Sequence, residues 1–260
     1  MNRWNFAFAF VILMGWACDE PRALAQDPRF AVHIPTTYDI GDSFAAEAHR
    51  VYVAEDNGGW IEVRSVQKPD PPIAILRTGY DRGGDDIAVD DPYLYVAEDN
   101  GGRVEVHDLM QGGSLVDAFM TTFDRGDALA ASMGLVFVAE DDGGLVEAYG
   151  HTPAGWQVVD RFVTSYDSGD DVAATNVAFL VAEDDGGLIE VHRGRVGQQN
   201  RIVSWEPKGN FGRTTFDRGD GLGAYILSRQ DGLDLVLCVA EDNGGRVECT
   251  TRNYSSWLRF

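Results

Sequence analysis

Basic side chains are scarce in this chain, and lysine is almost absent. The 260 residues carry 21 Lys and Arg against 42 Asp and Glu, only Lys68 and Lys208 are lysines, and the formal net charge is -21. Nucleic acids and anionic membrane surfaces are bound through basic patches. The composition therefore argues against both as partners and favours cations or cationic ligands. The alternative is that the acidity only keeps the protein in solution.

Long apolar runs are also lacking, apart from one near the start. Phe6 to Cys18 is apolar but too short to span a bilayer. With the basic residue in the opening MNRWN and the small residues of Ala23-Leu24-Ala25, it is typical of a signal peptide over residues 1-25, cleaved before Gln26. Lipidation of Cys18 is the less favoured alternative, because Gly15-Trp16-Ala17 departs from the usual lipoprotein residues.

This signal peptide leads us to expect a protein that is secreted, periplasmic or otherwise in the cell envelope. No further segment after cleavage is predicted to cross a membrane. The mature chain, residues 26-260, is expected to form a single domain. It keeps only two cysteines, Cys238 and Cys249, and an even pair in an oxidising compartment favours a disulfide.

What the chain does have is repetition. The phrase Val-Ala-Glu-Asp-(Asn/Asp)-Gly-Gly, here called the VAED turn, begins at Val53, Val96, Val138, Val181 and Val239. The first four copies are 43, 42 and 43 residues apart, and the last lies 58 residues further on. Upstream of each copy lies an aspartate signature, an aromatic residue followed by Asp-x-Gly-Asp, with one extra Gly in the second copy. Self-similarity at this period indicates stacked supersecondary units.

Each unit predicts four short strands. Alternating apolar stretches such as Leu94 to Ala97 are separated by turn residues. Apolar residues recur at every second position in these stretches, and the chain has 30 glycines. Both features exclude helical repeats of similar length. Four antiparallel strands repeated at about 43 residues predict an all-β fold, a five-bladed β-propeller.

The start of the domain supplies a strand that the last unit lacks. Arg29 to Thr37 matches the strands before the third and fourth signatures but belongs to no unit of its own. We expect this N-terminal strand to complete the fifth blade and close the ring, because closure removes exposed strand edges. The tail, Ser255 to Phe260, is the alternative occupant of that edge. The longer last interval predicts two insertions, around Gly194 to Gly212 and around Ser228 to Leu233.

The VAED turn also predicts a strand register. If each hairpin turns on its central Asn-Gly or Asp-Gly pair, Tyr52 faces Val63 across the hairpin. The same turn position in the other four hairpins pairs Tyr95 with Val106, Phe137 with Ala148, Leu180 with Val191 and Cys238 with Cys249. Direct cross-strand neighbours lie within disulfide reach, so a Cys238 to Cys249 disulfide is predicted. Two buried free thiols are the alternative.

The acidic residues of both motifs are expected on one rim of the central channel, because the loops that carry them emerge on the same face of a propeller. Oxygen ligands gathered in this way suit Ca²⁺, although no EF-hand spacing is present. Asp and Asn beside Gly are also ordinary turn formers, which is the alternative explanation. The predicted metal ligands are Asp42, Asp85, Asp86, Asp127, Asp170, Asp171, Asp220, Glu55, Glu98, Glu140, Glu183 and Glu241.

A second row of glutamates, one in each third strand, projects away from the apolar pairs. If buried, these glutamates need donors such as Arg82, Arg125 or Arg218. His107 and His192 share one repeat position just after the third strand and are expected at the surface. The glutamates are Glu62, Glu105, Glu147, Glu190 and Glu248.

The sequence motifs of common catalytic sites are missing. There is no G-x-S-x-G, no phosphate loop and no Cys/His nucleophile pair. Glycoside hydrolases need two carboxylates in different environments, whereas the acidic residues here recur almost identically in each unit. We therefore expect a protein that is not an enzyme. A carbohydrate-active hydrolase using carboxylates at the central channel is the alternative.

The unit VYVAEDNGGWIEV, followed by Pro69 to Pro72, resembles the LVIVD-type repeats of exported bacterial β-propellers over most of residues 38 to 250. The resemblance implies a propeller in the cell envelope or outside the cell, and it brings no catalytic residue to this chain. The third strands depart from that pattern, because they carry a central Glu and no closing Asp.

These observations together predict an exported, monomeric binding or interaction module. Its acidic face would take Ca²⁺, with no other cofactor expected. Repeated, near-equivalent sites favour a multivalent ligand, because avidity compensates for weak individual sites. A glycan, a cell-surface polymer or a protein ligand fits this description.

Overall fold

The computed structural model describes residues 32–39, 41–47, 49–56, 58–80, 85–176, 178–184, 187–196, 202–229, 232–242 and 245–253. The predicted signal peptide, with Cys18, lies outside the described residues, as does the C-terminal tail. In the part of the chain that is described, no helix has the length and apolar character needed to cross a bilayer.

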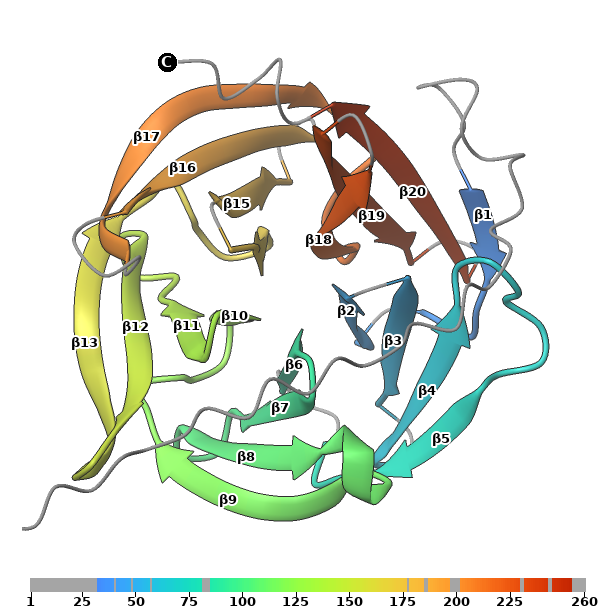
Figure 1. The fold of residues 1–260 in the computed structure, drawn as a ribbon, viewed down its shortest axis with the longest axis horizontal. Helices are drawn as coiled ribbons and strands as arrows, with labels where there is room; N and C mark the ends of the chain where they lie inside the picture. Colours follow the sequence, from blue (N-terminus) through green and yellow to red (C-terminus); the bar gives the residue numbers. More distant parts are fainter. Residues whose placement is uncertain are drawn as a thin grey trace, which may run out of the picture.

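Five four-stranded antiparallel sheets stand around a central axis, which confirms the predicted five-bladed propeller (Figure 1). Blades 1 to 4 follow the first four repeat units, and each runs from an innermost to an outermost strand. The strands of blades 1 and 2 are β2 (Ser43–Glu47), β3 (Arg50–Glu55), β4 (Trp60–Ser65) and β5 (Ala74–Arg77), then β6 (Asp86–Asp90), β7 (Tyr93–Glu98), β8 (Arg103–Asp108) and β9 (Ser114–Met120).

The remaining blades follow the same order. Blade 3 has β10 (Ala128–Ser132), β11 (Leu135–Ala139), β12 (Leu145–Thr152) and β13 (Gly155–Val163), and blade 4 has β14 (Asp171–Ala174), β15 (Ala178–Glu183), β16 (Leu188–Val196) and β17 (Ile202–Arg213). Blade 5 has β18 (Gly221–Arg229), β19 (Gly232–Glu241), β20 (Arg246–Asn253) and β1 (Val32–Pro35). The two predicted insertions coincide with β17 and with the β18–β19 hairpin, whose strands are longer than their counterparts.

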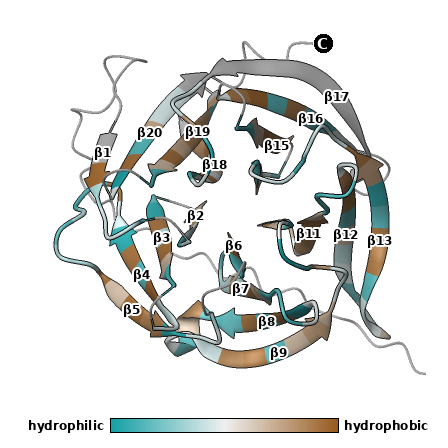
Figure 2. Ribbon diagram, turned by 180° about the vertical axis from the view of Figure 1, so that it is seen from behind, coloured by the Kyte–Doolittle hydropathy of each residue, from teal (hydrophilic) through white to brown (hydrophobic). Residues whose placement is uncertain are grey.

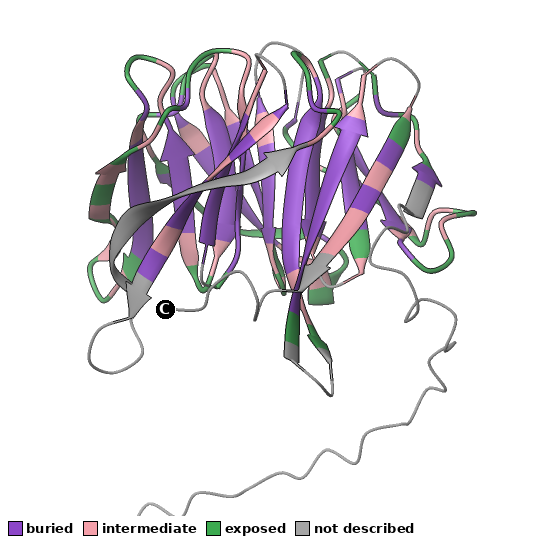
Figure 3. Ribbon diagram, turned by 90° about the horizontal axis from the view of Figure 1, so that it is seen from above, coloured by how far each residue is buried: buried purple, intermediate pink, exposed green. Residues whose placement is uncertain are grey.

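The hydrophobic core lies between the blades. Five clusters of buried residues each join two adjacent blades, so both faces of every sheet are covered. This explains why all of Val51 to Ala54 in β3, and of Leu94 to Ala97 in β7, are buried. Figure 2 shows hydrophobic residues on inner strands such as β11 and β15, and Figure 3 shows buried strand centres between more exposed turns.

The N-terminal strand closes the ring, as predicted. β1 pairs antiparallel with β20, and Ile34, opposite Val247, is completely buried. The backbone N–H of Thr36 extends the pairing to the Gly245 carbonyl at 2.6 Å. The free edge of β20 is therefore occupied by β1, and not by the tail that was the alternative.

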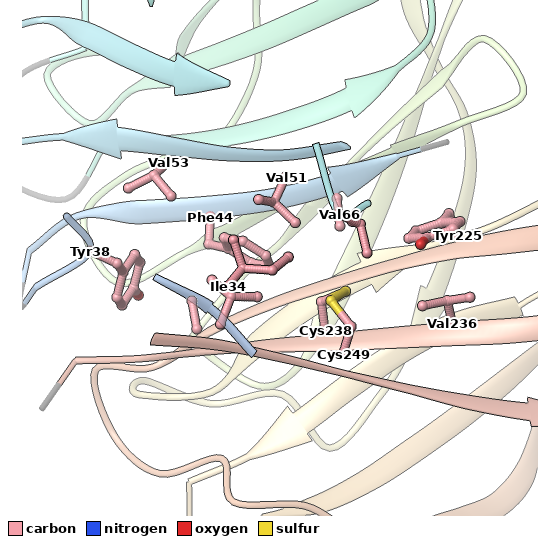
Figure 4. Packing of buried hydrophobic residues seen from close by; sticks show 13 residues of the cluster. Ile34, Tyr38, Phe44, Val51, Val53, Val66, Tyr225, Val236, Cys238 and Cys249 are labelled. Atoms are coloured by element: carbon pink, nitrogen blue, oxygen red, sulfur yellow. A yellow bond between two sulfur atoms is a disulfide. The ribbon is translucent and has the colours of Figure 1, made fainter. Parts of the chain in front are cut away.

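The predicted hairpin register is confirmed in all five blades. Tyr52 faces Val63, and the equivalent pairs follow in β7–β8, β11–β12 and β15–β16. In blade 5, Cys238 faces Cys249, and the two are joined by the predicted disulfide. Figure 4 shows the disulfide within the buried cluster between blades 5 and 1, near Ile34 of the closing strand.

In four of the five VAED turns, the last glycine lies too close to the segment that follows the outermost strand of its blade for a side chain to fit. Gly144 has a φ of 66°, and a Cβ there would lie 2.3 Å from the Thr164 carbonyl oxygen. Gly144→Ala is therefore expected to lower the free energy of unfolding by about 2 kcal/mol, from left-handed strain and this contact. Urea unfolding measures the loss.

Gly134 provides the matched control in the same blade. Its φ is 71°, but nothing lies within 4 Å of a Cβ placed there. Gly134→Ala should cost only about 1 kcal/mol, the backbone strain alone. Equal losses for Gly134→Ala and Gly144→Ala would show that the close contact has no effect.

Candidate functional site

The second aspartate of the signature holds the VAED turn against the chain that leads into the innermost strand. In blade 3, Asp127 accepts hydrogen bonds from the backbone N–H of Asp124 at 3.0 Å and from that of Asp141, in the turn, at 3.0 Å. The N–H of Asp127 donates to the Asp124 carbonyl at 3.2 Å. One carboxylate thus joins both motifs, which explains why they recur together.

The same clamp recurs around the ring, so both motifs lie on one face as predicted. In blade 2, Asp85 accepts from the N–H of Asp99 at 2.8 Å, while the first signature aspartate lies outside the described residues. The complete clamps of blades 1, 4 and 5 are Asp42 with Asp39 and Asp56, Asp170 with Asp167 and Asp184, and Asp220 with Asp217 and Asp242.

Three carboxylates converge at each of four clamps, and we name these groups the rim triads. In blade 3, one oxygen from each of Asp124, Asp127 and Asp141 lies within 4.8 Å of the other two. The triads of blades 3, 4 and 5 have no ion pair with a basic side chain anywhere in the described part of the chain. The other rim triads are Asp39, Asp42 and Asp56; Asp167, Asp170 and Asp184; and Asp217, Asp220 and Asp242.

The central carboxylate of each rim triad has a raised pKa and so binds its proton more tightly than usual. Burial, together with the charges of Asp124 and Asp141, raises the pKa of Asp127 to about 6 against the lowering effect of its backbone donors. Burial raises the pKa values of Asp42, Asp170 and Asp220 to about 6 in the same way. A bound cation would relieve this repulsion between like charges. The carboxylate oxygens of each rim triad are close enough together to hold a metal ion.

The predicted metal ligands divide into groups with different surroundings. Four of them, Asp42, Asp127, Asp170 and Asp220, belong to rim triads, and Asp85 forms the same clamp. The glutamates do not join the triads. Glu55 bonds the Thr37 hydroxyl, Glu98 pairs with Arg103 at 2.8 Å, Glu183 bonds Ser165 at 3.0 Å, Glu241 lies 3.5 Å from Arg246, and Glu140 follows β11.

The residue after each glutamate completes the triad instead. Asp56, Asp141, Asp184 and Asp242 open the turn, one residue beyond the glutamate. Successive side chains at the end of a strand point to opposite sides, and the aspartate is the one of the two that joins the triad. This parity was the signal that the sequence-based selection overlooked.

Asp86 and Asp171, the remaining predicted ligands, connect adjacent blades. Asp86 begins the innermost strand of blade 2 and accepts from the N–H of Leu129, in blade 3, at 2.6 Å. Asp171 begins the innermost strand of blade 4 and accepts from the N–H of Leu222, in blade 5, at 2.5 Å. Burial raises the pKa of Asp86 to about 6 and that of Asp171 well above its usual range, with the Asp86 charge adding to the rise at Asp171.

A tyrosine connects the blades at three junctions. The aromatic residue of the signature donates its hydroxyl to a glycine carbonyl of the preceding blade. Tyr38 reaches Gly219 at 3.0 Å, Tyr80 reaches Gly41 at 3.0 Å and Tyr166 reaches Gly126 at 2.7 Å. In blades 3 and 5 the aromatic residue is Phe123 or Phe216, which has no hydroxyl.

The two kinds of interblade hydrogen bond complement each other. The junctions where phenylalanine replaces tyrosine, between blades 2 and 3 and between blades 4 and 5, are those bridged by Asp86 and Asp171. Where the strand begins with Ala128 or Gly221 instead, the tyrosine supplies the bond. Junction 1/2 has its tyrosine bond and a second bond at the start of the innermost strand, where the Ser43 hydroxyl accepts from the N–H of Ile87 at 3.1 Å. The extra aspartates of blades 2 and 4 thus have a structural role that their sequence position alone did not indicate.

Three of the third-strand glutamates are bonded by the residue two positions later. Glu62 receives Arg64 at 2.7 and 2.8 Å, Glu105 lies 2.9 Å from His107, and Glu147 receives the Tyr149 hydroxyl at 2.6 Å. These donors come from the same strand, and further arginines come from β8, β13 and β20, so naming Arg125 and Arg218 as donors was wrong. Arg82, the third arginine named, lies outside the described residues.

The placement of the two repeat-related histidines at the surface was also wrong. His107 and His192 are buried with only 3% and 2% of their surface exposed, and His192 lies 3.1 Å from Glu190. Residues two apart in a strand share a face, so each histidine is enclosed with its glutamate between two blades.

The central channel is narrow and is lined by apolar side chains. Its walls are the innermost strands, which contribute small residues such as Ala45, Ala88, Ala130, Ala173 and Ala224. The open volume is about 20 Å³, little more than one water molecule requires. Among the described residues, this leaves no room for a sugar ring inside the channel.

Glu47 lies at the other end of the innermost strand of blade 1. Burial raises its pKa to about 7, and the charges of Asp90 and Asp91 contribute. Because the folded state holds this proton more tightly than the unfolded chain, the stabilising effect is full below the unfolded pKa and disappears as the pH rises through about 7.

Glu47→Gln is therefore expected to stabilise the protein relative to the parent more at pH 8 than at pH 5. Urea unfolding of both proteins across this range measures the difference. Glu98→Gln is the control, because the partly exposed Glu98 pairs with Arg103 instead of with other carboxylates. A constant difference between Glu47→Gln and the parent from pH 5 to 8 would contradict the raised pKa.

Comparisons with known proteins support the fold. No protein-family model and no curated protein matches this sequence. Among solved structures, the chain is similar to the glutaminyl cyclase of Myxococcus xanthus, with 12% identity and a TM-score of 0.57, covering 85% of this chain and 94% of that one. It is also similar to a functionally unknown protein from Desulfotomaculum acetoxidans, with 14% identity and a TM-score of 0.44, covering 78% and 65%.

At these identities the likenesses concern the fold alone, and the second is too distant to carry an argument. The first is consistent with the ring of five blades. The rim triads and the interblade bonds rest on this chain's own geometry.

Proposed function

We propose that this protein is an exported binding module whose rim triads take divalent cations, Ca²⁺ above all. The observation that carries the proposal is the repetition of one acidic geometry in four blades, without basic partners in blades 3, 4 and 5 of the described chain. Extracellular calcium sites commonly have dissociation constants of about 10⁻⁴ to 10⁻³ M. Several weak sites on one rim would therefore fill together at millimolar Ca²⁺.

The partner of the loaded rim would be a multivalent ligand with anionic or hydroxyl groups, such as a glycan or cell-surface polymer. Cations held on an otherwise acidic face can bridge to such groups. Repeated sites on one face would give avidity without high affinity at any one of them. The disulfide and the resemblance to exported LVIVD-type propellers support a location outside the cytoplasm.

Calcium should stabilise the protein against heat. After chelation, addition of millimolar Ca²⁺ is expected to raise the melting temperature, because a ligand at about one to ten times its dissociation constant stabilises the folded state by about 0.4–1.4 kcal/mol per site. Sodium chloride of equal ionic strength controls for general screening. Calorimetry should report several equivalent sites.

Asp124→Asn tests the triad itself. Asp124 contributes its side chain to the blade 3 triad, while only its backbone N–H and carbonyl enter the clamp, so the fold should be retained. The variant should bind one fewer Ca²⁺. Asp160→Asn is the matched control, because Asp160 is half-buried on β13 and belongs to no rim triad, so this variant should bind the full number. Unchanged melting at millimolar Ca²⁺, with no heat of binding, would refute the calcium proposal.

One observation favours the competing hypothesis of a hydrolase. Asp86 and Asp171 have pKa values raised to different extents, as an acid and a base require. Against it, both oxygens of each carboxylate accept backbone N–H groups, and the channel beside them is nearly filled. Assays on oligosaccharides, and a glutaminyl cyclase assay prompted by the solved neighbour, would decide. Activity lost in Asp86→Asn would favour the enzyme.

A further inference from the structure

Asn100 and Gly101 form the tip of the hairpin between β7 and β8. Asn100 is exposed, and its side-chain amide makes no hydrogen bond within the described residues. Gly101 has a φ of 138°, and nothing lies within 4 Å of the position that a Cβ would take. The carboxamide and the next backbone nitrogen therefore share open space with no side chain between them.

The backbone on both sides of this pair is held. The N–H of Asp99 donates to Asp85 at 2.8 Å, and that of Gly102 donates to the Glu98 carbonyl at 3.2 Å. The N–H of Gly101 donates no hydrogen bond in the part of the chain described. In blade 3, by contrast, the equivalent N–H of Gly143 donates to the Asp141 carbonyl at 3.0 Å. The Gly101 nitrogen is therefore the more available of the two for reaction.

We propose that Asn100–Gly101 is a self-modifying site that loses ammonia without an enzyme. A solvent base removes the Gly101 amide proton, and the nitrogen attacks Cγ of Asn100, closing a cyclic imide. The bond from Cγ to the side-chain nitrogen breaks, and that nitrogen leaves with a solvent proton as ammonia. One water then opens the imide at either carbonyl, which leaves aspartate or isoaspartate at position 100.

The fold accommodates the first product. Blades 3 and 4 already carry aspartate at the equivalent position of the turn, Asp142 and Asp185. Aspartate at position 100 would add one negative charge beside Glu98 and Asp99 and leave the turn unchanged. Isoaspartate would insert a methylene group into the backbone of a tight turn, so this branch alters the hairpin.

Asn176 is an internal control in the same molecule. It is exposed in the turn between β14 and β15, but valine follows it. The branched side chain of valine crowds the backbone nitrogen that would have to attack. The structure therefore predicts modification at Asn100 and an intact amide at Asn176.

Incubation of the folded full-length protein at mildly alkaline pH, in water enriched in heavy oxygen, tests the site. Proteolysis and mass spectrometry should show isoaspartate and aspartate, labelled with heavy oxygen, accumulating at position 100 while Asn176 stays unlabelled. Asn100→Gln should remove the signal, because its longer side chain cannot close the same ring. The Asn100→Asp variant should melt as the parent does.

Two outcomes would overturn the proposal. Label at position 100 no greater than at Asn176 would show that the exposed tip does not react. Labelling of position 100 only after urea unfolding would show that the folded hairpin prevents the attack.

Discussion

A chain that begins at Thr36, and so lacks β1, is expected to lose cooperative folding. Removal of β1 leaves β20 with an unpaired edge and takes Ile34 out of the cluster between blades 5 and 1. Burial of one isoleucine alone stabilises by about 1.5–3 kcal/mol, and an exposed edge strand promotes association with other chains. Circular dichroism during heating should show a broad, low transition, and gel filtration should show oligomers.

Removal of Ser255 to Phe260 is the control for this truncation. The ladders of blade 5 are formed by β1, β18, β19 and β20, all of which this shorter chain keeps. It should melt close to the parent. If loss of the tail were as damaging as loss of β1, the N-terminal strand would not be the element that closes the ring.

Loss of the disulfide is expected to have the second largest effect. Cys238 and Cys249 are separated by 11 residues, and linking them restricts the unfolded chain by about 3 kcal/mol on the loop-entropy scale. The bond lies in the cluster against which Ile34 of β1 packs, so its loss should also weaken ring closure. Cys238→Ala/Cys249→Ala should therefore unfold in less urea than the parent.

Reductant supplies the control for this variant. Both cysteines are buried, so the folded parent should resist reduction under native conditions. When reductant is present in the urea, the parent should unfold at the same urea concentration as the double alanine variant, apart from a small difference in packing. If the parent unfolded at the same urea concentration with and without reductant, the disulfide would not have the proposed stabilising effect.

The architecture could be predicted because it depends on periodicity. The interval near 43 residues indicated the size of one blade, and the five copies of the VAED turn indicated the number of blades. The Asn-Gly and Asp-Gly turns predicted the hairpin register that places Cys238 opposite Cys249. The closing strand followed from counting, since the last unit lacked one strand. These features are local in sequence or repeated several times, so each copy supports the others.

The rim was harder to predict because it depends on contacts between motifs. The sequence indicated that acidic residues gather on one face, but it did not indicate that Asp127 uses its oxygens to hold the N–H groups of Asp124 and Asp141. Nor could repeat alignment reveal that Asp86 substitutes for a missing tyrosine hydroxyl at the next junction. The first depends on the distance between two motifs of one unit after folding, and the second on a distance across blades, which no repeat unit contains within itself.

The buried histidines were missed for a related reason. A polar residue at the end of a strand is ordinarily exposed, and His107 follows that pattern in sequence. Its burial depends on Glu105 on the same face and on the Gly113 carbonyl, 3.0 Å from its other ring nitrogen. A strand pattern of Glu-x-His between two covered faces is the signal that could have identified the pair.

The alternation of tyrosine and aspartate bonds divides the ring unequally. Blades 5, 1 and 2 are joined through tyrosine hydroxyls, and so are blades 3 and 4, whereas the two junctions between these arcs depend on carboxylates. The propeller is thus an arc of three blades and an arc of two, meeting at two seams. A circular permutation that places new chain ends at a seam would cut between arcs, and one placed elsewhere would cut within an arc.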